Sequence, residues 1–231
     1  MVGSPTRTPT TETSTPSPGA TACTIQFNDV PQGSTFYEFI RCLACRGIIN
    51  GYPDRTFKPN NLVTRGQLSK IVSNAAGFGD PQPDQMFEDV PVGSTFQVYI
   101  GRLASRGYIN GYPCGGVGEP CVPPENLPYF RPNNNATRGQ ISKIVSNAAG
   151  YIEPPVGQTF EDVPVGSTFY DFIERLASRG VMGGYPCGGV GEPCVPPENR
   201  PYFRPNNNAT RGQTSKIVAN TFFPACQTPA R

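Results

Sequence analysis

The sequence of 231 residues contains no histidine and no tryptophan, and charged residues make up only 16% of it. Without histidine, most zinc sites and most hydrolytic triads are excluded, so we expect no metal and no cofactor. The net charge is +2 and lysine-rich runs are absent, which argues against a nucleic-acid partner. No apolar stretch approaches the roughly 20 residues of a transmembrane segment.

Proline and glycine are abundant, at 27 and 26 residues, which predicts short elements joined by many turns. The eight cysteines have short, regular spacings, and this favours a disulfide framework in an extracellular, oxidising compartment. Residues 1–22 consist largely of Thr, Ser and Pro, and we expect a disordered linker that tethers the rest to an upstream segment. Because the start lacks the pattern of a signal peptide, we expect a removed signal or a fragment of a longer chain.

Three copies of one repeat follow the linker. A Phe-x-Asp-Val-Pro block opens each copy, at Phe27, Phe87 and Phe160, and a Thr-Arg-Gly-Gln block closes it. The interval from Gly-Tyr-Pro to Thr-Arg-Gly-Gln is 13 residues in copy one and 26 in copies two and three, so the last two share an inserted loop. We expect repeats at 23–80, 81–153 and 154–226, with a tail at 227–231.

Each copy has the apolar spacing of two short helices. In copy one the first apolar stripe contains Phe36 and Leu43, with Thr35 as the expected N-cap. The second contains Leu68 and Val72. Because two short helices bury too little surface to fold alone, we expect a mainly α unit in which three copies share one core. Thr214 replaces the apolar residue at the position of Leu68, and we expect it to face solvent because no fourth copy follows.

The order of these blocks resembles the S-layer homology (SLH) domain. Copy one shows it most directly, in Gly51–Pro59 followed by Val63–Gln67, and the resemblance covers nearly all of residues 27–222. It implies three tandem repeats folded as a pseudo-threefold bundle that attaches surface proteins non-covalently to cell-wall polysaccharide. The implied ligand is an anionic, often pyruvylated, polymer held in grooves between repeats. The arginine of the family's Thr-Arg-Ala-Glu motif contacts it, and the matching residues here are Arg65, Arg138 and Arg211.

Two features depart from the family pattern. Thr-Arg-Gly-Gln stands where the family has Thr-Arg-Ala-Glu, so the acidic residue is absent from every copy. The family's frequent tryptophan in the first helix is also absent, and the nearest aromatic substitutes are Phe36, Phe96 and Phe169. We expect the fold to be unaffected by either change.

The Thr-Arg-Gly-Gln block has two interpretations. Its threonine and glutamine have the spacing of a helix capping box. The same helix start would offer N–H groups and a favourable dipole to an anion, and the arginine a fork for a carboxylate. For the arginines the alternative is a structural salt bridge, and Gly66 is expected to leave room for a ligand. The candidate ligand-binding residues are Thr64, Arg65, Thr137, Arg138, Thr210 and Arg211.

Two further sets are candidates for the ligand site. Asp29, Asp89 and Asp162 precede the first helices, where each carboxylate is expected to accept N–H bonds from a turn or to pair with an arginine of a neighbouring repeat. Tyr52, Tyr112 and Tyr185 lie between Gly and Pro in a turn. Their rings either stack on a sugar or pack on the core. The Asn-Gly pairs of these turns are expected to have positive φ.

The cysteines form two groups. Cys114 with Cys121 and Cys187 with Cys194 bracket the same sequence in both inserted loops, and each pair is expected to form a local disulfide. Cys23, Cys42, Cys45 and Cys226 remain. We favour Cys23–Cys42 with Cys45–Cys226, and the crossed pairing is the alternative. A redox role for the Cys42-Leu-Ala-Cys45 pair lacks the expected strand-then-helix setting.

These observations favour a non-catalytic module at the cell surface that binds anionic polysaccharide in grooves between repeats. The alternative is a structural module that binds other surface proteins or forms filaments without a glycan. An enzyme is disfavoured because there is no histidine and no metal cluster, and because adjacent carboxylates such as Glu161 and Asp162 seldom face one cleft.

Overall fold

The computed structural model describes residues 23–82 and 84–227, so the linker expected at 1–22 lies outside the described residues, as does most of the expected tail. Within the described residues there are six α-helices and one short 3₁₀-helix. They are α1 (Tyr37–Cys45), α2 (Arg65–Ala75), α3 (Gln97–Ala104), α4 (Arg138–Ala148), α5 (Tyr170–Ser178), α6 (Arg211–Phe222) and η1 (Pro224–Gln227).

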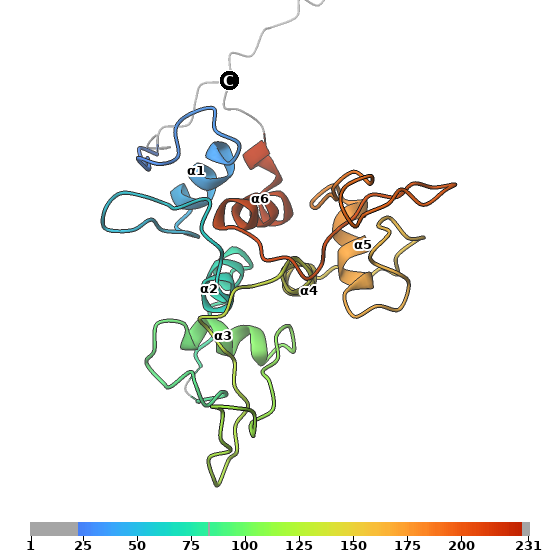
Figure 1. Ribbon diagram of the computed structural model, residues 1–231. Coiled ribbons are helices and arrows are strands. Elements are labelled where there is room, and N and C mark those ends of the chain that lie inside the picture. The colour runs from blue at the N-terminus through green and yellow to red at the C-terminus, as the bar shows by residue number, and fades with distance from the viewer. Residues whose placement is uncertain (1–22, 83, 228–231) are drawn as a thin grey trace, which may run out of the picture.

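The second helices of the three repeats, α2, α4 and α6, contact one another at the centre (Figure 1). The first helices lie outside them, and each packs on the second helix of the preceding repeat: α3 on α2, α5 on α4, and α1 on α6. Because α1 of the first repeat covers α6 of the last, the repeats close into a ring. This arrangement confirms the expected mainly α bundle of three repeats.

A cycle of three backbone hydrogen bonds joins the repeats just before the central helices. Val63 donates its N–H to the carbonyl of Ala209 (3.0 Å), Ala209 to Ala136 (3.2 Å), and Ala136 to Val63 (2.9 Å). All three side chains are fully buried. The backbone N–H and carbonyl groups of these residues are therefore all paired only when all three repeats are in place.

The closed ring explains why the expectation for Thr214 was wrong. Its side chain is fully buried, like those of Leu68 and Ile141 at the same position of the other repeats. A closed ring has no terminal repeat, so α6 is as enclosed as α2 and α4. The threonine hydroxyl is accommodated by donating to the carbonyl of Thr210 at 2.9 Å, one turn earlier in the helix.

The local disulfides Cys114–Cys121 and Cys187–Cys194 are confirmed, and so is the crossed pairing of the other four cysteines. Cys23 bonds Cys45 and Cys42 bonds Cys226, so the favoured pairing was wrong and the two helical cysteines do not pair with each other.

The packing of α1 accounts for this crossed pairing. Cys226 follows α6, which packs on α1, and it is buried where Cys42 meets the core. Cys45 ends α1 on the side reached by the N-terminal segment, where Arg41 donates to the carbonyl of Cys23 at 3.1 Å.

The first helices do not begin as expected. Phe36, Phe96 and Phe169 occupy their N-cap positions, and no side chain caps them, so Thr35 is not a cap. Each phenylalanine ring instead covers the glycine of a Thr-Arg-Gly-Gln block in the preceding repeat. A Cβ added to Gly66 would lie 2.5 Å from Cδ2 of Phe96. The glycine therefore makes room for a phenylalanine, not for a ligand.

The same close approach occurs at Gly139 with Phe169 and at Gly212 with Phe36, at 2.4 Å in both. The missing tryptophan and the glycine of Thr-Arg-Gly-Gln are thus parts of one packing contact, because the phenylalanine at the tryptophan position rests on the glycine that stands where the family has alanine. The turn glycines Gly51, Gly111 and Gly184 are also required by close approach, to the first phenylalanine of each repeat. The expected positive φ at Gly51 and Gly111 is not found.

We expect Gly66→Ala to lower the free energy of unfolding by about 1–3 kcal/mol, because the added methyl group overpacks the Phe96 contact. Urea unfolding followed by circular dichroism measures the change. Gly79→Ala is the matched control, since a Cβ there meets no atom within 4 Å and its φ is not positive. Equal stability of the two variants would contradict the packing account, and adding Phe96→Leu to Gly66→Ala should recover part of the loss.

Candidate functional site

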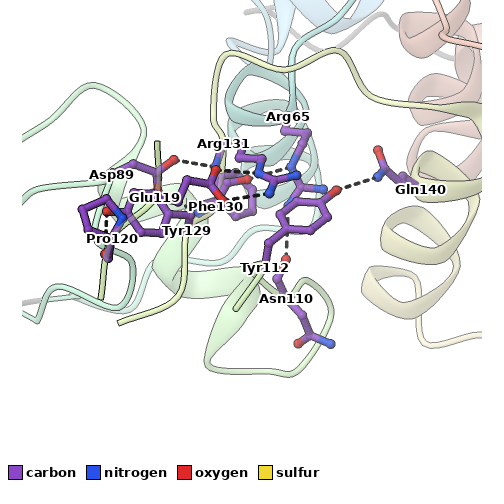
Figure 2. Close-up of polar contacts among 10 residues, drawn as sticks. All are labelled: Arg65, Asp89, Asn110, Tyr112, Glu119, Pro120, Tyr129, Phe130, Arg131 and Gln140. Carbon is purple, nitrogen blue, oxygen red and sulfur yellow. Dashed lines mark hydrogen bonds and ion pairs between the residues drawn. The ribbon is translucent and has the colours of Figure 1, made fainter. Parts of the chain in front are cut away.

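The aspartates before the first helices hold a turn of their own repeat. The carboxylate of Asp89 accepts the N–H of Phe130 at 2.7 Å and that of Arg131 at 2.6 Å (Figure 2). Arg131 has a φ of 60°, a left-handed conformation that a non-glycine residue seldom adopts, and the two bonds stabilise it. Asp29 and Asp162 make the same pair of bonds. The expected N–H bonds from a turn are therefore confirmed.

The three arginines of Thr-Arg-Gly-Gln join each repeat to the next. Arg65 donates through Nε to the carbonyl of Phe130 (2.9 Å) and through Nη2 to that of Asn110 (3.1 Å), both in the second repeat (Figure 2). Arg138 reaches the third repeat and Arg211 the first in the same way. The alternative expectation, a structural salt bridge, was wrong, because these guanidinium groups donate to main-chain carbonyls and not to a carboxylate.

These guanidinium groups are buried and stacked on aromatic rings. Arg65 is 6% exposed, and its Cζ lies 4.3 Å from the ring centre of Phe130 and 5.3 Å from that of Tyr112. Desolvation lowers the pKa of all three arginines. Arginine nevertheless keeps its proton in proteins, so each guanidinium group remains a buried cation at the contact between two repeats. Cation–π contact and two carbonyls offset the cost of burying it.

The helix starts leave little for an anion to bind. The side chain of Thr64 accepts the N–H of Gln67 in a reciprocal capping box, and Thr137 and Thr210 do the same. The N–H groups of Arg65 and Gly66 donate to carbonyls of Asn134 and Pro132 in the next repeat, both at 2.8 Å. Capping is thus confirmed, while the first backbone donors of the helix are already used within the protein.

The turn tyrosines are half-buried and have one ring face covered. The Cζ of Arg131 lies 3.8 Å from the ring centre of Tyr112, and Arg204 lies 3.9 Å from that of Tyr185. In the first repeat Lys58 takes this place, with Nζ 4.3 Å from Tyr52. A cation of the same repeat therefore occupies one face of each tyrosine ring.

Three equivalent grooves lie between the repeats, with volumes of about 210, 200 and 320 Å³ for grooves 1, 2 and 3. Each takes its turn, glutamine and lysine from one repeat, its arginine from the preceding repeat, and a threonine and phenylalanine from the following one. Groove 1 contains Tyr52, Gln67, Lys70, Phe96 and Arg211; groove 2 contains Arg65, Tyr112, Gln140, Lys143 and Phe169; groove 3 contains Phe36, Arg138, Gly183, Gln213 and Lys216. Every groove therefore needs all three repeats.

The grooves bring together only part of the set predicted from sequence. The three arginines line them, as do Tyr52 and Tyr112, but the capping threonines, the aspartates and Tyr185 are not among the lining residues. Groove 3 has Gly183 where the other two have an asparagine. In groove 2 the side-chain amide of Gln140 donates to the hydroxyl of Tyr112 at 3.4 Å (Figure 2).

Sequence reasoning missed the groove lysines. Lys70, Lys143 and Lys216 are three of the four lysines in the chain, and each lies three residues after the glutamine of Thr-Arg-Gly-Gln. That spacing places the lysine and the glutamine on one helix face. This threefold recurrence was a signal in the sequence. Each groove thus has one arginine and one lysine, and none of its lining residues is acidic.

Among residues 23–82 and 84–227, no group of His, Cys, Asp and Glu is arranged to hold a metal ion. In the same part of the chain, no helix has the length and apolar character that crossing a membrane requires.

The family model of the S-layer homology domain matches residues 26–69, 94–141 and 159–215, which together make up more than half of the chain. Each match begins before the first helix of a repeat and ends within its second helix. The three matched segments therefore correspond to the three repeats of the ring.

Relatives share this region as part of much longer proteins. An endoglucanase of Bacillus sp. (strain KSM-635) is 25% identical over 203 residues, which cover 85% of this chain and 19% of the relative. Cell surface glycoprotein 1 of Acetivibrio thermocellus is 27% identical over 190 residues, which cover 75% of this chain and 7% of the relative. The middle cell wall protein of Brevibacillus brevis is 25% identical over 122 residues, which cover 53% of this chain and 9% of the relative. The chain thus spans less than a fifth of these relatives.

Proposed function

The chain belongs to the S-layer homology domain family, and from this premise we propose that its three grooves bind an anionic cell-wall polysaccharide and so anchor a surface protein without catalysis. Membership of the family makes the chain a cell-surface anchoring module, as expected from the sequence. The polymer, its charge and the grooves as its site are the parts that we propose.

The pairing of two cations with no acid in every groove carries this proposal. A lysine is a mobile point charge, whereas the arginine is already fixed by carbonyls, so the lysine is the group free to meet a ligand carboxylate. The groove volumes lie at or below the lower end of small-molecule sites, about 300 Å³ and more. Each groove therefore suits a single acidic sugar unit.

Three weak sites on one rigid ring suit a polymer with a repeating unit. Binding at one groove raises the effective concentration of the polymer at the other two, so avidity exceeds the affinity of any single groove. We assign the capping threonines and the aspartates a supporting role here, because their polar atoms are already bonded within the protein.

Two observations support a non-catalytic role. Glycoside hydrolysis typically needs two carboxylates that flank the bond to be broken, and the lining residues of the grooves include none. The endoglucanase relative matches this chain over only 19% of its own length.

We expect Lys70→Gln, Lys143→Gln and Lys216→Gln, combined in one variant, to weaken binding to isolated wall polysaccharide at least about tenfold. The reason is that each groove loses its one mobile cation, and a charge-assisted contact contributes about 1.5–3 kcal/mol. Co-sedimentation of the purified protein with the polysaccharide measures the change.

Arg46→Gln is the control for loss of a positive charge, since Arg46 lies over the ring of Phe223 and neither residue lines any of the three grooves. The triple variant should unfold in urea with a free energy within about 0.5 kcal/mol of the parent, because surface substitutions rarely change stability more. Undiminished binding by the triple variant would remove the grooves as the site.

A further inference from the structure

The inserted loops of the second and third repeats are bonded to arginines that lie on the turn tyrosines of the same repeats. Glu119 lies inside the loop that Cys114–Cys121 closes, and its carboxylate accepts from Nε of Arg131 at 2.7 Å and from Nη2 at 2.8 Å (Figure 2). The Glu119 side chain is only 16% exposed, and the bonds from Arg131 lower its pKa. A bidentate ion pair between arginine and a carboxylate is stronger than hydrogen bonds between neutral groups.

The pair ends on a ring that lines a groove. Arg131 lies 3.8 Å from the ring centre of Tyr112, and Tyr112 exchanges backbone hydrogen bonds with Tyr129 at 2.8 and 2.9 Å. The hydroxyl of Tyr129 donates to the carbonyl of Pro120, at the base of the same loop, at 3.0 Å (Figure 2). Loop, arginine and tyrosine are therefore linked from two sides.

The third repeat copies this arrangement and the first does not. Glu192 makes two 2.7 Å bonds to Arg204, which lies 3.9 Å from Tyr185. In the first repeat Lys58 and Asp54 are 3.6 Å apart, with side chains 38% and 56% exposed. An exposed pair of this kind holds its members only weakly.

We propose that Glu119 and Glu192 are positioning residues, which hold Tyr112 and Tyr185 through Arg131 and Arg204. Groove 2, which Tyr112 lines, then has a fixed wall, while groove 1, which Tyr52 lines, has an adaptable one. The consequence for affinity rests on the proposed function: a pre-organised wall loses less entropy on binding, so groove 2 binds the acidic sugar more tightly than groove 1.

The test substitutes Glu119→Gln in the full chain, with Glu125→Gln as a control in the same insertion but outside the part that Cys114–Cys121 closes. Glu125 is exposed. Ring signals of Tyr112 in NMR spectra should move towards those of Tyr52 in the first variant only, without any ligand. In titrations with the methyl glycoside of a pyruvylated hexosamine, the midpoint at groove 2 should rise about three- to tenfold and the midpoint at groove 3 should stay unchanged.

Unchanged ring signals would overturn the positioning role, as would an unchanged midpoint at groove 2 when the sugar binds. If the glycoside and the wall polysaccharide bind no groove of the parent protein, the proposed function fails. The ring signals still decide on the positioning role in that case.

A second feature is independent of any ligand: both ends of the ring are bonded to one turn of one helix. Cys23 is joined to Cys45, and Cys226 to Cys42, across sequence separations of 22 and 184 residues. The shortest covalent path from residue 23 to residue 226 therefore runs through two disulfides and the four residues of α1 between them. The rest of the ring lies outside that path.

We infer that the two disulfides form a bypass for tension, which carries a pulling force between the two ends of the unit without loading the ring. Tension is transmitted along the shortest covalent path, and the segment in that path is one helical turn. Extending this turn lengthens the protein by less than about 15 Å. The grooves thus keep their shape while the chain is under load.

Single-molecule stretching of the oxidised full chain through its two termini tests the bypass. We expect the parent protein to show no unfolding step from the ring. Cys42→Ser with Cys226→Ser should release roughly 600 Å, because the residues after Cys45 enter the path at about 3.5 Å each. Cys23→Ser with Cys45→Ser should release only about 60 Å, since the bond from Cys42 to Cys226 still excludes the ring.

Cys114→Ser with Cys121→Ser is the control, because this disulfide lies outside the path and the parent behaviour should persist. A release of hundreds of ångströms from the oxidised parent protein would overturn the inference. So would free thiols at Cys42 or Cys226 in the mass spectrum of that protein.

Discussion

The buried arginine at the start of each central helix is the interaction on which this structure depends. It takes a cation out of water and places it on two carbonyls and an aromatic ring of the next repeat. Such a charge is tolerated only while its partners are in place, since an unpaired buried charge costs several kcal/mol. Because Arg211 reaches back to the first repeat, the three contacts form a closed cycle.

The other short-range features present each arginine with its partners. Asp89 holds the left-handed turn whose carbonyl at Phe130 accepts from Arg65, so the bonds within a repeat prepare the bond between repeats. The capping box fixes the helix start that carries the arginine, and the small Gly66 lets Phe96 close over it. The grooves are built from these contacts, so a single repeat contains no complete groove.

Features that depend on neighbours in the chain were predictable from sequence. The capping boxes and the local disulfide between Cys114 and Cys121 join residues at most seven positions apart, and the helices follow from apolar spacing. Features that depend on ring closure were not. The burial of Thr214 and the partner of Cys42 follow from α1 packing on α6, which the order of the repeats does not reveal.

The groove shows the same division. Its arginines were identified through the family motif, whereas their carbonyl acceptors lie 45–161 residues away in sequence. The lysines recur in every copy, but only the ring places each of them beside an arginine from another repeat.

The most direct test of the arginine cycle is the free energy of unfolding of a variant with Arg65→Lys, Arg138→Lys and Arg211→Lys, measured in urea. The charge is unchanged, but a lysine lacks the planar fork that meets two carbonyls and a ring. The account predicts a loss of roughly 3 kcal/mol or more, at about 1 kcal/mol for each hydrogen bond that is not replaced. A variant as stable as the parent protein would contradict it.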